Sequence, residues 1–88
     1  MTRENIKETV IDLITEVFAE QHFDRDILEY IDLIDDAVMD SITFITLVVK
    51  IEDEFNITLS DEILLMDNFK NSDDIITVVE NEMFKNSQ

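Results

Sequence analysis

The chain lacks cysteine, glycine and proline, and it has only six lysines and arginines in 88 residues. Without cysteine there is no disulfide framework, no thiolate nucleophile and no cysteine-based metal site. Without glycine there is no glycine-rich phosphate loop, which excludes nucleotide binding of the P-loop or Rossmann type. The turns must therefore be made by Asn, Asp and Ser.

Acidic residues are abundant, and the formal net charge is −16. Nucleic acids and anionic membrane surfaces attract basic proteins, so this charge argues against both as partners. Basic proteins are the expected partners instead. No apolar run approaches the length of a membrane span, and residues 1–8 lack the apolar core of a secretory signal. We therefore expect a cytoplasmic protein.

A chain of this length makes one small domain, residues 1–88, with an ordered core expected over about residues 3–84. Apolar residues recur at spacings of three and four, which favours helices over strands because the alternation typical of strands is absent. The Ser60-Asp61-Glu62 and Ser72-Asp73-Asp74 segments are typical of helix starts, with a cap followed by acids. The pattern predicts four helices, over Arg3 to about Glu20, Ser41 to Phe55, Asp61 to about Met66, and Ser72 to about Phe84.

A long connection joins the first two predicted helices, because the helical pattern breaks between residues 21 and 40. Structureless loops of this length are uncommon in small domains. Its many apolar residues predict that the connection is pinned to the core, with a turn of helix around Asp26 to Tyr30. The expected fold is all-α, a four-helix bundle with a long first loop and a short third helix.

The segment Met39-Asp40-Ser41-Ile42 lies at the start of the predicted second helix. Either Asp40 or Ser41 can accept a hydrogen bond from a free backbone N–H, so the pair is also an ordinary helix start. Asn56 suits the end of this helix, since Asn tolerates the left-handed conformation. Ser41 falls off the stripe that should be buried, which consists of Phe44, Leu47, Val48, Ile51 and Phe55.

Three aliphatic residues, Ile42, Ile45 and Val49, fall together on a different face of the same helix. Part of this face should be exposed, which makes it a candidate docking surface beside the serine. The alternative is that another helix covers it.

The Met39-Asp40-Ser41-Ile42 segment, with the run that ends in Ile51-Glu52-Asp53-Glu54-Phe55, resembles the phosphopantetheine attachment region of acyl carrier and peptidyl carrier proteins. The core signature of that family is Asp-Ser-Leu or Asp-Ser-Ile. The resemblance covers the whole chain, because its length, acidity, long first loop and short third helix also fit the four-helix bundle of the family.

The resemblance implies that Ser41 carries a 4′-phosphopantetheine arm from coenzyme A, with Asp40 as part of the attachment motif. It also implies three partners: a phosphopantetheinyl transferase, a loading enzyme of the adenylation or acyltransferase type, and a downstream condensing or acyl-transfer enzyme. The carrier itself would be no enzyme. A phosphodiester suits a helix N-terminus, where free N–H groups and the helix dipole favour anions. A chain without cysteine also needs an external thiol to carry thioesters.

Two departures from the family pattern bear on the pathway. Many members place a glycine shortly before the Asp-Ser pair, where this chain has Asp35-Asp36-Ala37-Val38-Met39. The exposed side of the second helix is less acidic than in many fatty-acid carriers. We therefore expect a stand-alone, monomeric carrier of a specialised polyketide or peptide pathway, with a housekeeping fatty-acid carrier as the alternative. Ile42, Ile45 and Val49, with Glu52 and Asp53, form the expected partner-binding surface.

Other functions fit the residues less well. An unmodified acidic adaptor that binds a basic partner through Ile42, Ile45 and Val49 is the alternative from a different class. An EF-hand requires a glycine at its turn, and His22 has no partner histidine or cysteine, so no metal site is expected. Met39, Met66 and Met83 are expected to pack in or around the core.

Overall fold

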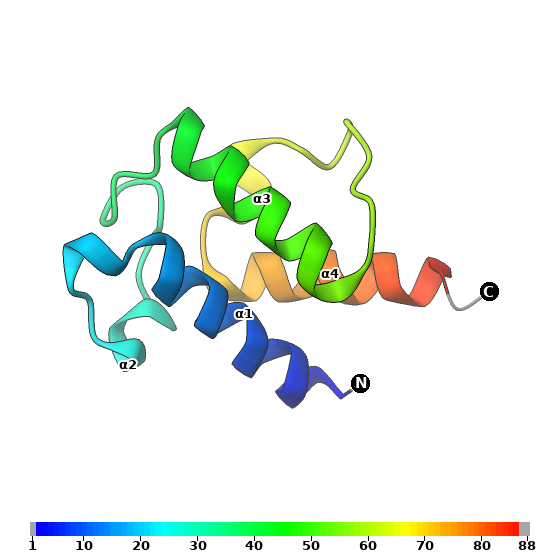
Figure 1. The fold of residues 1–88 in the computed structure, drawn as a ribbon, viewed down its shortest axis with the longest axis horizontal. Helices are drawn as coiled ribbons and strands as arrows, with labels where there is room; N and C mark the ends of the chain where they lie inside the picture. The colour runs from blue at the N-terminus through cyan, green and yellow to red at the C-terminus, as the bar shows by residue number, and fades with distance from the viewer. Residues whose placement is uncertain (1, 87–88) are drawn as a thin grey trace.

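Three helices of fifteen residues carry the fold, which a computed structural model describes for residues 2–86 (Figure 1). They are α1 (Arg3–Val17), α3 (Ser41–Phe55) and α4 (Ser72–Asn86). The shorter elements are η1 (Ala19–Gln21), α2 (Arg25–Leu28) and η2 (Met66–Phe69). Within residues 2–86 there is no strand, so the predicted all-α fold is confirmed. Three residues of the predicted domain, Met1, Ser87 and Gln88, lie outside the described residues.

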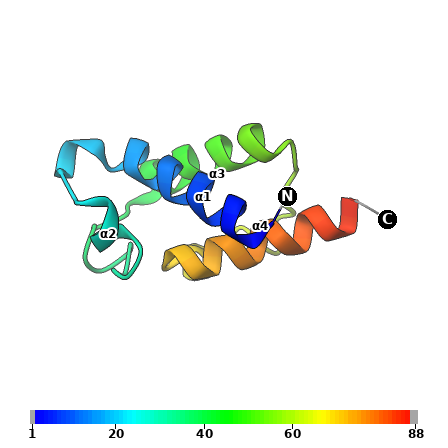
Figure 2. The same cartoon turned by 90° about the horizontal axis from the view of Figure 1, so that it is seen from below.

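Helix α1 packs against both α3 and α4 (Figures 1 and 2). The hydroxyl of Thr2 caps its start by accepting the N–H of Asn5 at 3.2 Å. Ile11 and Phe18 are buried although they lie off the main apolar stripe of this helix, which consists of Ile6, Val10, Leu13, Ile14 and Val17. The buried face is therefore wide because the helix receives two neighbours, which the periodicity alone left undecided.

The long connection before α3 is pinned to the core, as predicted. Its apolar side chains Leu28, Leu33, Ala37 and Met39 are all buried. Backbone polar groups of the connection also bond to the start of α4, where the N–H of Leu33 donates to the carbonyl of Lys70 at 2.6 Å. Ser72 donates its hydroxyl to the carbonyl of Glu29 at 3.0 Å. Because few buried polar groups go unpaired, this chain segment has a defined path although α2 is its only α-helix.

The short third helix lies later in the chain than predicted. Residues 61–63 form only a turn, and Leu65 is extended and exposed, which prevents a helix from running through to Met66. The helical turn is instead η2, which buries Phe69 completely. The Phe69 ring packs edge-on against Phe44, with ring centroids 5.2 Å apart. Burial of this aromatic side chain outweighs the local capping signal.

The start of α4 is also capped by a different residue than the sequence suggested. Asn71 accepts the N–H of Asp74 at 2.9 Å through its side chain. Ser72, the expected cap, is fully buried and bonds to the long connection instead. The helix runs to Asn86, two residues beyond the predicted end.

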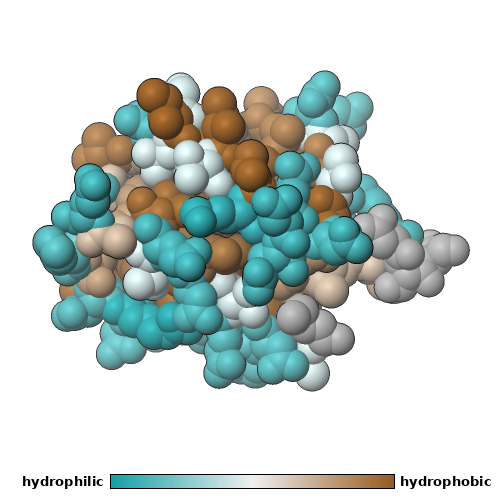
Figure 3. Space-filling view, in the orientation of Figure 1, coloured by the Kyte–Doolittle hydropathy of each residue, from teal (hydrophilic) through white to brown (hydrophobic). Residues whose placement is uncertain are grey.

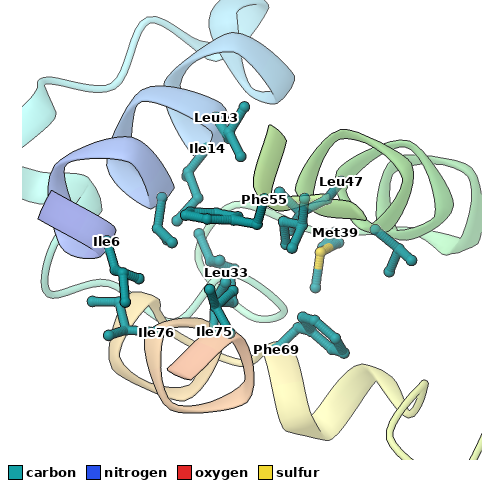
Figure 4. Close-up of a cluster of buried hydrophobic side chains, with 14 of the residues drawn as sticks. Ile6, Leu13, Ile14, Leu33, Met39, Leu47, Phe55, Phe69, Ile75 and Ile76 are labelled. Carbon is teal, nitrogen blue, oxygen red and sulfur yellow. The ribbon is translucent and has the colours of Figure 1, made fainter. Parts of the chain in front are cut away.

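The core lies between the three long helices and the chain segments that precede α3 and α4 (Figure 4). Of the predicted stripe on α3, Leu47, Val48, Ile51 and Phe55 are buried, whereas Phe44 is half-buried against Phe69. Met39 is buried, and Met66 and Met83 pack partly buried against the core, as predicted. On the opposite side of α3, Ile42, Ile45 and Val49 are exposed, so no helix within residues 2–86 covers that side.

Candidate functional site

Ser41 is the first residue of α3, and its side chain is exposed. The start of this helix stands at the end of the molecule opposite to the start of α1 and the end of α4 (Figure 1). The preceding residue, Asp40, is the helix cap: its Oδ1 accepts the N–H of Thr43 at 2.8 Å, and its carbonyl accepts the N–H of Phe44 at 2.9 Å. The predicted helix start is thus confirmed, with Asp40 as the cap and Ser41 presented to solvent.

The carboxyl group of Asp40 stays ionised well into the acid range. The hydrogen bond from the Thr43 backbone N–H, then that from the Thr43 hydroxyl, holds the Asp40 pKa below its ordinary value of 3.8. Its negative charge lies at the positive end of the helix dipole, where an anion is stabilised. The same dipole and the remaining free N–H groups of the first turn would favour a phosphate on the Ser41 oxygen, against the repulsion from the Asp40 carboxylate.

A tight loop leads into the site, and the side chain of Asp32 holds its backbone through hydrogen bonds. Asp32 Oδ1 accepts the N–H groups of Ile34 and Asp35, both at 2.9 Å, and the ammonium of Lys70 lies 3.5 Å from Oδ2. These contacts hold the pKa of Asp32 below its ordinary value of 3.8, and the hydrogen bond from the Asp35 N–H contributes most. The N–H of Met39 closes the loop by donating to the carbonyl of Leu33 at 3.0 Å. Sequence reasoning did not single out Asp32, although Asp is a common residue at such turns.

The aliphatic face of α3 is exposed. Ile42, Ile45 and Val49 are 77%, 60% and 48% exposed, so no helix among residues 2–86 covers them. In the space-filling view, apolar side chains gather along the upper edge of the molecule, over α3 (Figure 3). An exposed apolar surface of this kind is typical of a docking site.

The far end of α3 carries the acidic residues predicted to bind partners. Glu52 is half-buried, and its Oε2 accepts the N–H of Leu59 at 2.8 Å, so it supports the chain that leaves the helix. Asp53 and Glu54 are exposed. Asn56 ends the helix in the left-handed conformation with φ 54°, as predicted. Acids at the negative end of a helix dipole are unfavourable for folding, so Asp53 and Glu54 do not stabilise this end of α3.

The positive charges of the chain are already paired. Each of the six lysines and arginines in residues 2–86 forms an ion pair with an acid of the same chain: Arg3 with Glu80, Lys7 with Glu29, Arg25 with Asp12, Lys50 with Glu16, Lys70 with Asp32 and Lys85 with Glu82. The remaining acids are not balanced by cations of the chain. A partner that approaches the protein therefore meets a negative electrostatic potential.

A separate surface hollow of about 530 Å³ lies against the second half of α4, and no motif in the sequence indicates it. It is lined by Ile63, Asn68, Val78, Asn81, Phe84 and Lys85. Among residues 2–86 no three His, Asp or Glu side chains are grouped to hold a metal ion. None of the helices described is both long and apolar enough to span a membrane.

The all-helical fold and the exposed serine at the start of α3 are compatible with a carrier protein, and the family comparison assigns the class. The family model described as the phosphopantetheine attachment site matches residues 8–77. The chain therefore belongs to the phosphopantetheine-binding family, whose members bind a 4′-phosphopantetheine prosthetic group. Comparisons with curated proteins and with solved structures found no match.

Family membership makes this chain a non-catalytic carrier of thioesters on phosphopantetheine. It implies that the chain interacts with a phosphopantetheinyl transferase and with enzymes that use acyl groups. The residues at the start of α3 fit the prosthetic group, because an exposed hydroxyl, a long helix and its N-terminal dipole coincide there.

Proposed function

We propose that Ser41 is the residue that accepts the phosphopantetheine arm. The observation that carries this proposal is the exposed hydroxyl at the first residue of a fifteen-residue helix whose cap is Asp40. In the transfer, the Ser41 oxygen forms a phosphodiester bond with the phosphopantetheine phosphate of coenzyme A, adenosine bisphosphate leaves, and the transferase takes the hydroxyl proton. When bound, the arm supplies the terminal thiol that this chain lacks.

Ser41 acts in this proposal as an acceptor and not as a catalytic nucleophile. The carboxylate next to it, Asp40, is held by the Thr43 backbone and is ionised, so its role is to fix the start of the helix. The lone histidine, His22, ends η1 in the long connection before α3. Activation of the hydroxyl therefore falls to the transferase.

The test is the intact mass of the purified chain after incubation with coenzyme A and a broad-specificity phosphopantetheinyl transferase. We expect the wild type to gain one phosphopantetheine and the Ser41→Ala variant to gain none. Ser60→Ala is the matched control, because Ser60 is also an exposed serine followed by acids but does not start a helix. An unmodified wild type would contradict the proposal and favour an unmodified adaptor.

We further propose that the exposed side of α3 receives the partner enzymes. Ile42, Ile45 and Val49 would supply the apolar contact, and Asp53 would meet a basic residue of the partner. Glu52 would contribute through the position it gives the chain after α3, since its carboxylate is bound to Leu59. These residues share one helix with Ser41, so a partner bound to them is close to the arm.

The pathway we propose is a specialised polyketide or peptide pathway and not housekeeping fatty-acid synthesis. The support is the composition of the α3 surface, where the exposed side chains include Ile42, Ile45, Thr46 and Val49 in addition to acids. The holo protein should be a poor substrate for the malonyl-loading and elongating enzymes of fatty-acid synthesis. Efficient elongation by those enzymes would assign it to the fatty-acid pathway instead.

A further inference from the structure

Val38 adopts a backbone conformation that is unfavourable for valine. Three residues among 2–86 have positive φ: His22 at 56°, Val38 at 52° and Asn56 at 54°. Asn and His are enriched in this left-handed region, whereas a β-branched residue there is a steric outlier. The chain thus uses tolerant residues at two of the three positions and valine at the third, two residues before Asp40.

The fold explains the backbone turn at position 38 but not the valine. The neighbouring residues Ala37 and Met39 are buried, and their N–H groups donate to the carbonyls of Asp32 and Leu33. These contacts set the direction of the chain on both sides of Val38. The Val38 side chain itself is 72% exposed, so it adds little to the core. Asparagine would satisfy the same backbone, as it does at position 56.

Val38 is close enough to Ser41 to lie under an enzyme that acts on the serine. Three residues of extended chain span at most about 11 Å. An interface of about 800 Å² per partner reaches about 16 Å from its centre, so Val38 lies inside the footprint of an enzyme centred on Ser41. Ile42, which follows Ser41 in the sequence, is also exposed. Asp35 and Asp40 are exposed acids of the same segment. The fitting partner surface is basic with an apolar contact at its centre.

We propose that Val38 is a specificity-determining residue for the phosphopantetheinyl transferase. In the complex the Val38 side chain packs against an apolar residue of the transferase while Ser41 enters the active site of that enzyme. Strained conformations persist where function uses them, and here the strain keeps an apolar side chain on the surface beside the acceptor. The inference rests on the proposed role of Ser41.

The experiment compares Val38→Asn and Val38→Ile with the wild type, using coenzyme A and the transferase from the same organism. Val38→Asn relieves the strain and removes the apolar contact. It should raise the melting temperature by about 4–8 °C, because asparagine tolerates the left-handed conformation and the steric strain of valine at position 38 is removed. It should also lower kcat/KM for modification about five- to twenty-fold. Val38→Ile keeps the apolar contact and should be modified at the wild-type rate.

His22→Asn is the matched control, because it changes another exposed residue of positive φ that is distant in sequence from Ser41. It should leave kcat/KM unchanged. A Val38→Asn variant that is modified as fast as the wild type, or that is less stable than it, overturns the inference and leaves the role of Ser41 intact. A wild type that is not modified at all overturns the role of Ser41 and the Val38 inference with it.

Discussion

Asp40 shows how one side chain prepares this site. Its carboxylate caps α3 through the Thr43 N–H, and the same contact lowers its pKa. A charged acceptor at a helix N-terminus stabilises both the hydrogen bond and the dipole, so the residue that begins the helix also fixes the position of Ser41. Substitution of Asp40 therefore affects the stability of α3 before it affects any chemistry.

The pKa of Asp40 leads to a prediction about acid stability. Because the folded pKa lies below the ordinary value of 3.8, the ionised Asp40 stabilises the fold above about that pH, and this contribution is lost as the pH falls through the folded pKa. Asp40→Asn keeps a capping oxygen but does not ionise. The stability difference between wild type and Asp40→Asn, measured by urea unfolding, should be constant from pH 7 to about pH 5 and shrink below about pH 4.

The comparison with Asp40→Asn is needed because the many other acids of the chain also titrate in this range. Protonation of unpaired acids relieves repulsion and changes the stability of both proteins equally. A difference that does not change with pH would show that Asp40 has the same pKa in the folded and unfolded chain.

Single residues also mark the limit of prediction from sequence. The helix start at the Asp40-Ser41 pair and the helix end at Asn56 were predicted because these side chains favour such positions by local chemistry, although the sequence left open which of the pair is the cap. The cap at Asn71 was missed because Ser72 has the same local preference, and only the tertiary bond from Ser72 to Glu29 separates the two. The left-handed Val38 was missed because its local preference opposes the conformation that buried neighbours impose.

Helix α3 has one face for the core and one for solvent. Leu47 and Ile51 are fully buried, while Ile42 and Ile45 on the other side are mostly exposed. The periodicity predicted both faces. It could not decide whether a neighbour covered the second face, because coverage depends on how α1 and α4 pack.

The two faces should respond differently to the same kind of substitution. Ile45→Asp places a charge on exposed surface, so the melting temperature should change little while handover of acyl groups to a partner enzyme falls about tenfold or more. Leu47→Ala removes a fully buried side chain and should lower the free energy of unfolding by about 2–5 kcal/mol. Urea unfolding and acyl-transfer rates measure the two effects separately. Strong destabilisation by Ile45→Asp would place that residue in the core.

The third helical turn shows where local patterns stop being sufficient. The Ser60-Asp61-Glu62 segment has the composition of a helix start, but Ile63, Leu64 and Met66 after it are only partly buried against the core. Phe69, eight residues beyond Asp61, is drawn into the core against Phe44, and the helical turn forms where that aromatic requires it. Tertiary burial of one large side chain thus overrides a capping preference.

The charge distribution is a property of the molecule as a unit. All six cations are paired, and five of the pairs join different segments, whereas Lys85 and Glu82 both lie on α4. Pairs of this kind at the surface contribute little stability individually. The excess of acids therefore leaves a net repulsion that folding must overcome.

Added salt should stabilise this protein. Screening weakens the repulsion between unpaired acids more than it weakens a few exposed ion pairs, so the melting temperature should rise from low salt to about 0.15 M NaCl. Magnesium or calcium chloride at equal ionic strength should raise it at least as much, through weak and nonspecific binding to acids. Sucrose at matched osmolarity controls for general solute effects, and a melting temperature that does not respond to salt would contradict the account.

The architecture was predictable because helical periodicity is strong in all three long helices and the family resemblance extends along the chain. The packing of those helices was not predictable in the same way, because the apolar pattern of α1 does not say how many neighbours the helix has. In the structure α1 contacts both α3 and α4 (Figure 2). The serine could be singled out from its motif. Its exposure and the geometry of its cap required the structure.

The position of the arm within the chain tests the central claim most directly. After reaction with coenzyme A and transferase, proteolysis and tandem mass spectrometry should place one phosphopantetheine on the peptide that contains Ser41, and fragment ions should assign it to that residue. Peptides that contain Ser60 and Ser72 should be unmodified. An arm found on Ser60, on Ser72 or on no residue would contradict the assignment of Ser41 as the acceptor.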